Sequence, residues 1–340
     1  MRIKHLISSL LTVLAVSLSS GVAAKTILKF AIGLPDSQGG TVTGMKALKE
    51  YVEFKSNGEI EIRLFFNTLG SALQLAEQVK NGTLEMAMTD DSVLGSLHKP
   101  MQIFQIPYLF PSAPVAWEFM KSPFVRELNE DMRKTIGVRV LANCENGFRN
   151  ITNNVREVKT PDDMKGLKMR VIQSQVYVSF MKALGAGATP IAFPELITSL
   201  KQNVVDGQEN AAGGIFNEKI YEVQKFMSIN EHIYGLFFIS INDKVFQGLS
   251  PDMRQILIDG AATLAEVVNS RNSMESLQAV QKIRATGVTK VYVNSPTEKE
   301  LFKKQTQEPV IEFIASQVGR PLIDKLLDAV KESTRKSYAN

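Results

Sequence analysis

The chain has 340 residues, 44% hydrophobic and 22% charged, which is ordinary for a folded protein long enough to hold two lobes with a core each. The formal net charge is +4, and two of the basic residues, Arg2 and Lys4, lie in a leader without acidic residues. The remaining excess of about +2 predicts neither a nucleic-acid-binding surface nor a membrane-coating patch. The single cysteine, Cys144, excludes an internal disulfide.

Residues Met1–Ala24 have the pattern of a secretory signal peptide. Two basic residues precede a largely apolar stretch from Leu6 to Leu18, and the small residues Val22–Ala24 suit a cleavage site. We therefore expect an exported protein whose mature chain begins at Lys25. The alternative is an uncleaved membrane anchor, but the apolar stretch is shorter than the ~20 residues that a spanning helix needs and is interrupted by serines.

Short apolar strands alternate with helical patterns along the mature chain. The first group comprises strands at Ile27–Ile32, Ile60–Phe66 and Leu84–Met88 and helices at Thr41–Lys55 and Ser71–Asn81. After Asn153 the alternation restarts, with strands at Lys168–Ile172 and Thr189–Ala192 and helices at Val176–Leu184 and Pro194–Gln202. This order predicts an α/β fold with two lobes, each a mostly parallel sheet covered by helices. Because no long linker separates the two groups, we expect closely packed lobes joined by more than one crossing.

The longest helical pattern begins at Ser250-Pro251 and is not broken before Gly287. Such a helix would be roughly 50 Å long, which is about the span of two lobes. The alternative is a pair of helices with a kink near Asn269–Asn272.

Two arginines and an asparagine are the candidate ligand contacts. Arg149 follows Asn146-Gly147-Phe148, Arg170 ends Gly166-Leu167-Lys168-Met169-Arg170, and Asn210 closes Asp206-Gly207-Gln208-Glu209-Asn210. A guanidinium offers paired N–H donors that two carboxylate oxygens can accept together, so these residue types point to capture of an organic acid. The alternatives are that the arginines are solvated surface residues and that the Asp-Gly string is only a turn.

These strings resemble the periplasmic solute-binding subunits of tripartite ATP-independent periplasmic (TRAP) transporters, the family named for its C4-dicarboxylate-binding member. The resemblance runs from about Lys25 almost to the C-terminus. It also includes Lys55–Gly58, Leu109–Pro111, Thr189–Glu195 and Tyr221–Lys225. It implies a two-lobe periplasmic-binding-protein-like fold in which the long helix spans both lobes. The expected lobes are residues 25–148 with about 236–270, and 149–235 with about 271–340.

The resemblance also implies roles for individual residues. Arg170 is expected to make the paired salt bridge to the ligand carboxylate, with Asn210 assisting it and Arg149 as a second cation. Phe193 matches an apolar or aromatic wall against the ligand, although on composition alone it would be a core residue. The expected partner is a separate membrane permease. Self-association is not expected, so we predict a monomer.

The first lobe is expected to determine which acid is bound. Asp90 follows the strand Leu84–Met88, where relatives place a ligand-facing polar residue, and Gln74 stands where relatives that bind sugar acids commonly have Glu. The loop Gly33–Gly40 lacks a histidine often found in those relatives. A buried Asp90 would repel a second carboxylate, which favours a monocarboxylate bearing hydroxyl or amino groups, such as a sugar acid or hydroxy acid. The alternative is that Asp90 is an exposed strand cap.

Other functions have less support in the sequence. The three histidines, His5, His98 and His232, do not have the spacing of metal ligands. The string Gly185-Ala186-Gly187 is interpreted as a loop and not as a dinucleotide-binding motif. We therefore expect neither a metal nor a cofactor. An exported hydrolase using Asp162-Asp163 or Asp206 with Glu209 is a weak alternative, because the first pair is better explained as a helix start. A C4-dicarboxylate ligand, a different importer and a sensor remain open alternatives.

Overall fold

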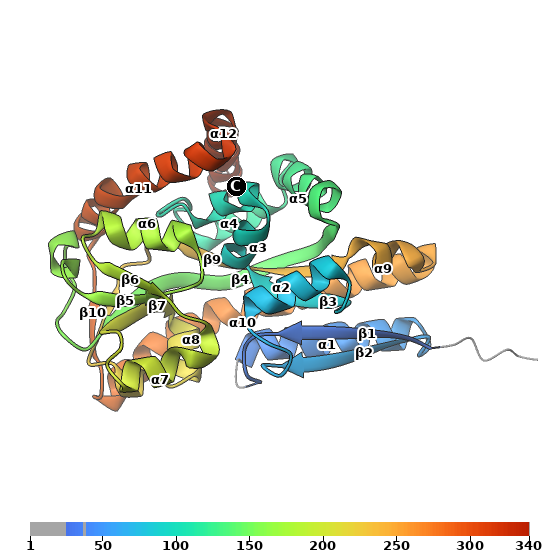
Figure 1. Ribbon diagram of the computed structural model, residues 1–340, viewed down its shortest axis with the longest axis horizontal. Helices are drawn as coiled ribbons and strands as arrows, with labels where there is room; N and C mark the ends of the chain where they lie inside the picture. The colour runs from blue at the N-terminus through green and yellow to red at the C-terminus, as the bar shows by residue number, and fades with distance from the viewer. Residues whose placement is uncertain (1–24, 37–38, 340) are drawn as a thin grey trace, which may run out of the picture.

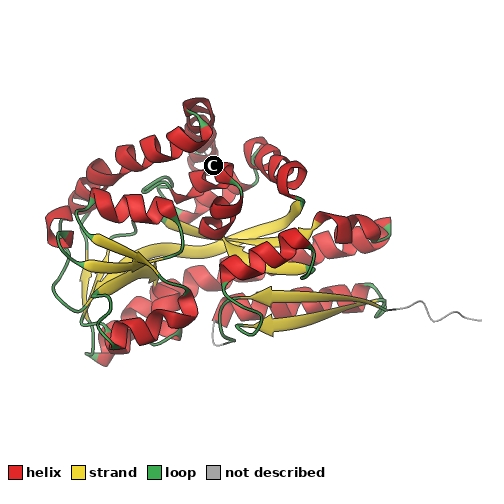
Figure 2. Ribbon diagram, in the orientation of Figure 1, coloured by secondary structure: helices red, strands yellow, loops and turns green. Residues whose placement is uncertain are grey.

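The computed structural model describes residues 25–36 and 39–339, so the expected signal peptide lies outside the described residues. The described chain is a mixed α/β protein in which helices cover both faces of the strands (Figure 2). The first group of elements is β1 (Thr26–Ile32), α1 (Gly39–Lys55), β2 (Ile60–Phe66), α2 (Ala72–Asn81), β3 (Met86–Asp90), α3 (Asp91–Leu97), the 3-10 segment η1 (Lys99–Gln105), α4 (Ala113–Met120) and α5 (Pro123–Ile136).

The chain then enters a second group of elements through one long strand. This group is β4 (Val138–Asn153), η2 (Pro161–Met164), β5 (Lys168–Val171), α6 (Gln175–Ala183), β6 (Gly187–Pro190), η3 (Phe193–Glu195), α7 (Leu196–Lys201), β7 (Gly207–Ala211), α8 (Ala212–Asn217), η4 (Ile220–Val223) and β8 (Phe226–Ile229). The last part comprises β9 (Tyr234–Asn242), α9 (Asp243–Gly248), α10 (Pro251–Thr286), β10 (Lys290–Val293), α11 (Pro296–Val318) and α12 (Arg320–Tyr338).

Three expected elements are displaced by two residues or divided in the structure, whereas the others differ by no more than two residues at an end. The strand expected at Leu84–Met88 is displaced to Met86–Asp90, so that Asp90 is its last residue. The strand expected at Thr189–Ala192 is Gly187–Pro190, because pairing with β5 begins at Gly187 opposite Lys168. The helix expected at Pro194–Gln202 is divided into η3 and α7.

Two sheets share the long strand β4, which changes partner halfway along its length. In the first sheet, β1 pairs parallel with β2 and β3, and β9 pairs antiparallel with β3 and with β4 as far as Phe148. From Arg149 onward β4 pairs antiparallel with β7, and β5 pairs parallel with both β6 and β7. The two lobes are therefore built on one continuous strand, and Arg149 is the first residue beyond the exchange of partners.

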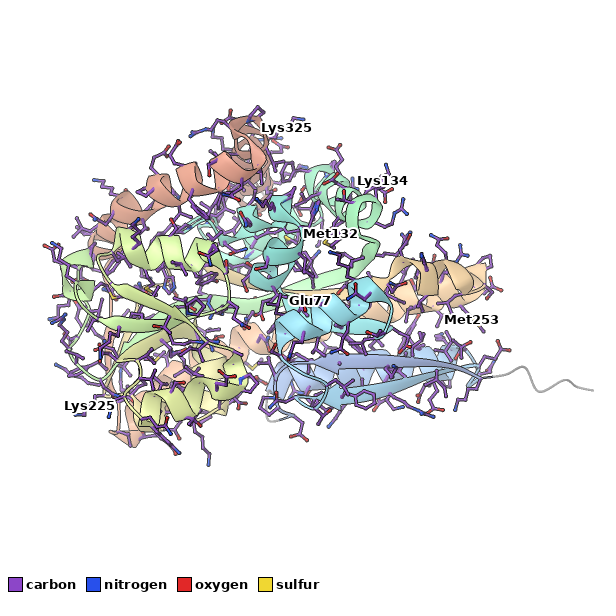
Figure 3. The ribbon with its side chains drawn as sticks, viewed as in Figure 1. Glu77, Met132, Lys134, Lys225, Met253 and Lys325 are labelled. Atoms are coloured by element: carbon purple, nitrogen blue, oxygen red, sulfur yellow. The ribbon has the colours of Figure 1, made fainter. Side chains whose placement is uncertain are left out.

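Helix α10 is a single helix of 36 residues, so the alternative with two helices is wrong. The Ser250 side chain accepts a hydrogen bond from the Met253 amide at its start, Pro251 occupies the first turn, and Gly287 ends it with a left-handed backbone at φ 68°. Helices α5 and α11 begin with the same Ser-Pro pair. Figure 1 shows α10 crossing from one lobe to the other, and Met253 near its start lies at the opposite end of the molecule from Lys225 (Figure 3).

Apolar side chains of α10 form one side of the core. α10 packs against α1 in the first lobe and against α8 in the second. On the other side of the sheets, one cluster of buried residues extends from Ala31 and Leu75 to Phe180 and Phe302 without a break between the lobes. Helix α11 packs against α6, whereas α12 packs against α4 and α5, so the C-terminal helices contact both groups of elements. Among the described residues, no helix has the length and apolar character needed to cross a membrane.

Candidate functional site

A cavity lies where the carboxyl ends of strands from both lobes meet. Its lining comes from the segments after β1, before α2, at the ends of β3, β5 and β7, and along β4 and β9. Of the candidates from the sequence, it contains Asp90, Arg149, Arg170, Phe193 and Asn210. The apolar part of the lining consists of Ile32, Leu34, Met88, Val93, Ile172, Ile191 and Phe237, with Phe193 and two alanines. The cavity therefore combines apolar walls with a few charged groups, as small-molecule sites do.

Arg170 offers an unused hydrogen-bond donor in this lining. The residue is 2% exposed, its Nε donates to the carbonyl oxygen of Ile191 at 2.9 Å, and its guanidinium centre lies 6.0 Å from the centroid of the Phe193 ring. Its Nη1 is buried and has no hydrogen-bond partner among the described residues. Burial lowers the pKa of Arg170 to about 10, which still leaves it charged at neutral pH. A buried cation with a free N–H is well suited to a carboxylate.

Arg149, by contrast, already has a carboxylate partner. Its Nε and Nη2 donate to the two carboxylate oxygens of Glu209 at 2.5 and 2.9 Å, and both side chains are buried. Burial opposes the charge on each partner, but their mutual attraction outweighs it, so the pKa of Arg149 is raised and that of Glu209 is lowered. Arg149 lines the cavity as one half of a neutral ion pair.

Asn210 and Phe193 both line the cavity close to Arg170. The Asn210 Oδ1 accepts the backbone N–H of Ala211 at 2.9 Å, so its NH₂ group is the part that remains to meet a ligand. The string Asp206–Asn210 is not merely a turn, because residues 207–211 form β7 and the Asp206 carboxylate accepts the Lys168 amide at 2.8 Å.

Asp90, the last residue of β3, contributes a carboxylate to the cavity lining. Its Oδ1 accepts a hydrogen bond from the Asn146 Nδ2 at 3.2 Å, and its side chain makes no capping hydrogen bond to α3. Burial raises the pKa of Asp90, with the nearby Arg149 and Arg170 opposing the shift. The structure thus excludes the alternative of an exposed cap.

Gln74 is the one predicted site residue that is not part of the cavity lining. It occupies the third position of α2 and is exposed, and its Oε1 accepts the Ser71 amide in a capping box. Ser71 and Ala72 line the cavity in its place.

Sequence reasoning missed several residues around the arginines. Glu209 was considered only as a catalytic acid, although Asp206 and Glu209 bind different partners, Lys168 and Arg149. His232 lies with its Nε2 3.4 Å from Glu209 Oε2, and its ring stacks on Phe180. These contacts join residues 23 to 60 positions apart, so spacing along the chain gave no signal for them. The described residues contain no cluster of three or more metal-ligating side chains.

Comparisons with known proteins assign the family. The model of bacterial extracellular solute-binding proteins, family 7, matches residues 36–317. The 2,3-diketo-L-gulonate-binding periplasmic protein of Escherichia coli is 30% identical over 72% of this chain and 74% of its own length. The C4-dicarboxylate-binding protein of Bacillus subtilis is 29% identical over 92% and 89%.

A solved structure gives the same assignment. The sugar acid binding protein of Advenella mimigardefordensis, in complex with galactonate, superposes with a TM-score of 0.86 at 31% identity and covers 91% of this chain and 99% of its own. The chain therefore belongs to family 7 of the bacterial extracellular solute-binding proteins, the solute-binding components of TRAP transporters.

Proposed function

We propose that this protein captures a small monocarboxylic acid in the cavity between its lobes and delivers it to a TRAP membrane permease from the periplasm. The expected ligands are sugar acids, hydroxy acids and related monocarboxylates, held by a salt bridge to Arg170. The unpartnered Nη1 of Arg170 supports this more than any other observation, because an unpaired buried donor is costly unless a ligand satisfies it.

The other groups of the cavity complete the site. Asn210 donates to the same carboxylate, Phe193 packs beside it, and Arg149 contributes positive potential that Glu209 largely cancels. Asp90 hydrogen-bonds a hydroxyl or amino group of the ligand, and its carboxyl group disfavours a second carboxylate. Gln74 acts indirectly, through the start of α2 that places Ser71 and Ala72 at the cavity wall.

Capture proceeds by hinged closure of the lobes. We place residues 25–148 and about 236–270 in the first lobe, and 149–235 and about 271–340 in the second, with α12 returning to the first. The exchange of partners on β4 between Phe148 and Arg149 supports the first boundary. Closure excludes water from the cavity and so strengthens each polar contact there. The protein is expected to act as a monomer.

A C4-dicarboxylate is the second candidate ligand, because the Bacillus subtilis relative binds one. Asp90 weighs against it, since one end of such a ligand meets Arg170 and the other approaches a carboxylate.

Thermal-shift screening followed by calorimetry tests the proposal. Galactonate and 2,3-diketo-L-gulonate should stabilise the wild-type protein without being consumed, whereas succinate should stabilise it less. The variant Arg170→Ala should lose about 2 to 5 kcal/mol of binding free energy, because it removes one partner of a buried charge pair. Arg170→Lys should also bind more weakly, because an ammonium group cannot hold the Ile191 carbonyl and a carboxylate in one plane.

Arg284→Ala, which removes an exposed arginine of α10, is the matched control and should bind as the wild type does. Wild-type affinity in Arg170→Ala would refute the assignment, and turnover of the acid would favour the hydrolase alternative.

A further inference from the structure

The charged groups around the cavity nearly cancel before a ligand enters. Arg149 and Glu209 neutralise each other as a bidentate pair. Arg170 and Asp90 have no ion-pair partner among the described residues and both line the cavity, so an ionised Asp90 balances the charge of Arg170. A monoanionic ligand bound at Arg170 therefore leaves one uncompensated negative charge in a closed, buried site. Such a charge is unfavourable in a medium of low polarity, so a buried group neutralises where it can.

Asp90 is the group placed to take up that proton. The charges of Arg149 of β4, Arg170 of β5 and Glu209 of β7 act on its carboxyl, and its own charge acts on Tyr177 of α6. A second carboxyl, Asp91, is adjacent in the chain, is 2% exposed, and accepts the Leu236 amide at one oxygen while the other has no partner among the described residues. Burial raises the pKa of both carboxyls, for Asp91 to about 7. The adjacent acid makes a charge on Asp90 still less favourable.

We propose that capture of a monocarboxylate at Arg170 is coupled to uptake of one proton by Asp90, so that the closed cavity carries no net charge. This inference rests on the proposed function and adds that the ligand-bound site contains a protonated Asp90. The neutral Asp90 carboxyl can then donate a hydrogen bond to a hydroxyl oxygen of the ligand while its other oxygen still accepts from Asn146.

The sign of the pH dependence follows from the neighbours of Asp90. The ligand carboxylate adds a like charge, and closure removes water, so both raise the pKa of Asp90 in the complex above its value in the free protein. Binding therefore takes up protons, and affinity increases as the pH falls between those two pKa values. With one proton coupled, the change is at most tenfold in Kd per pH unit.

Calorimetry between pH 5 and 8 tests the coupling, using galactonate and 2,3-diketo-L-gulonate, whose carboxyls stay ionised over this range. The wild type should bind more weakly as the pH rises. The observed heat should also differ between two buffers of different ionisation enthalpy by an amount that corresponds to proton uptake. Asp90→Asn, a neutral isostere, should bind with a Kd that changes less than twofold over the range.

Asp162→Asn, at an exposed acid of η2, is the matched control and should keep the wild-type pH profile. Binding of either acid without proton uptake, or an unchanged pH profile in Asp90→Asn, overturns the inference but leaves the proposed function standing. Failure of both acids to bind at any pH overturns the proposed ligand class itself.

Discussion

At the scale of single residues, the Arg149–Glu209 pair decides how stable the cavity wall is. Both side chains are buried and form two hydrogen bonds, so removing one partner leaves an uncompensated charge. We expect Glu209→Gln to lower the free energy of unfolding by about 3 to 5 kcal/mol, measured by urea denaturation at pH 7. The exposed pair of Arg335 and Glu332 provides the control, since Glu332→Gln should leave the midpoint of urea unfolding close to that of the wild type. Similar values for both variants would contradict the role given to the pair.

The difference in unfolding free energy between the wild type and Glu209→Gln should depend on pH, and the pKa of Glu209 determines the direction of that dependence. The pKa of Glu209 is lowered in the folded protein, because attraction to Arg149 outweighs burial. Its contribution is therefore fully present above the unfolded-state pKa near 4.5 and is lost as the pH falls through the lower folded-state value. The stability difference between the wild type and Glu209→Gln should accordingly shrink at acid pH, and a difference that grows there would count against the assignment.

At the scale of elements, close packing of α1 against α10 depends on glycine. A Cβ atom at Gly44 would lie 2.4 Å from Val268 Cγ2 and 3.0 Å from the Leu264 carbonyl oxygen. Replacing glycine by alanine within a helix normally gains up to about 1 kcal/mol, but this overlap requires the helices to separate, at about 1 to 3 kcal/mol. We expect Gly44→Ala to destabilise the protein in chemical denaturation. Gly248→Ala, where nothing lies within 4 Å of the added atom, should be neutral or slightly stabilising.

Local patterns predicted the elements better than they predicted the contacts between them. Ser250-Pro251 and Gly287 marked both ends of α10, because helix caps depend on a few adjacent residues. The 16 residues of β4 could not be recognised as one strand serving two sheets, since that role depends on partners in β7 and β9 far along the chain. Similarly, the place of Arg170 in the cavity lining was predicted from its string, whereas the partner of Arg149 is apparent only from the pairing of β4 with β7.

At the scale of the whole molecule, four elements meet where the lobes are joined. Glu145 of β4 lies next to a register shift in the pairing with β9, and its carboxylate accepts hydrogen bonds from Trp117 of α4, Tyr234 of β9 and Ser273 of α10 at 2.9 to 3.1 Å. Since β4 and α10 both pass between the lobes, we expect the proposed hinged closure to alter this set of contacts.

Trp117 is the single tryptophan of the chain, so its fluorescence reports on this junction alone. We expect galactonate to change the Trp117 emission of the wild type with the same Kd as calorimetry gives, although Trp117 does not line the cavity. Arg170→Ala should show no change at the same concentrations, because the ligand is not held and the lobes do not close. If galactonate releases heat on binding yet leaves the emission unchanged, the junction does not move, and capture occurs in a cavity already closed. Because the indole N–H lies within hydrogen-bonding distance of both Glu145 and Tyr234, even a small rotation of β4 against α4 changes its surroundings, which makes the absence of a signal informative.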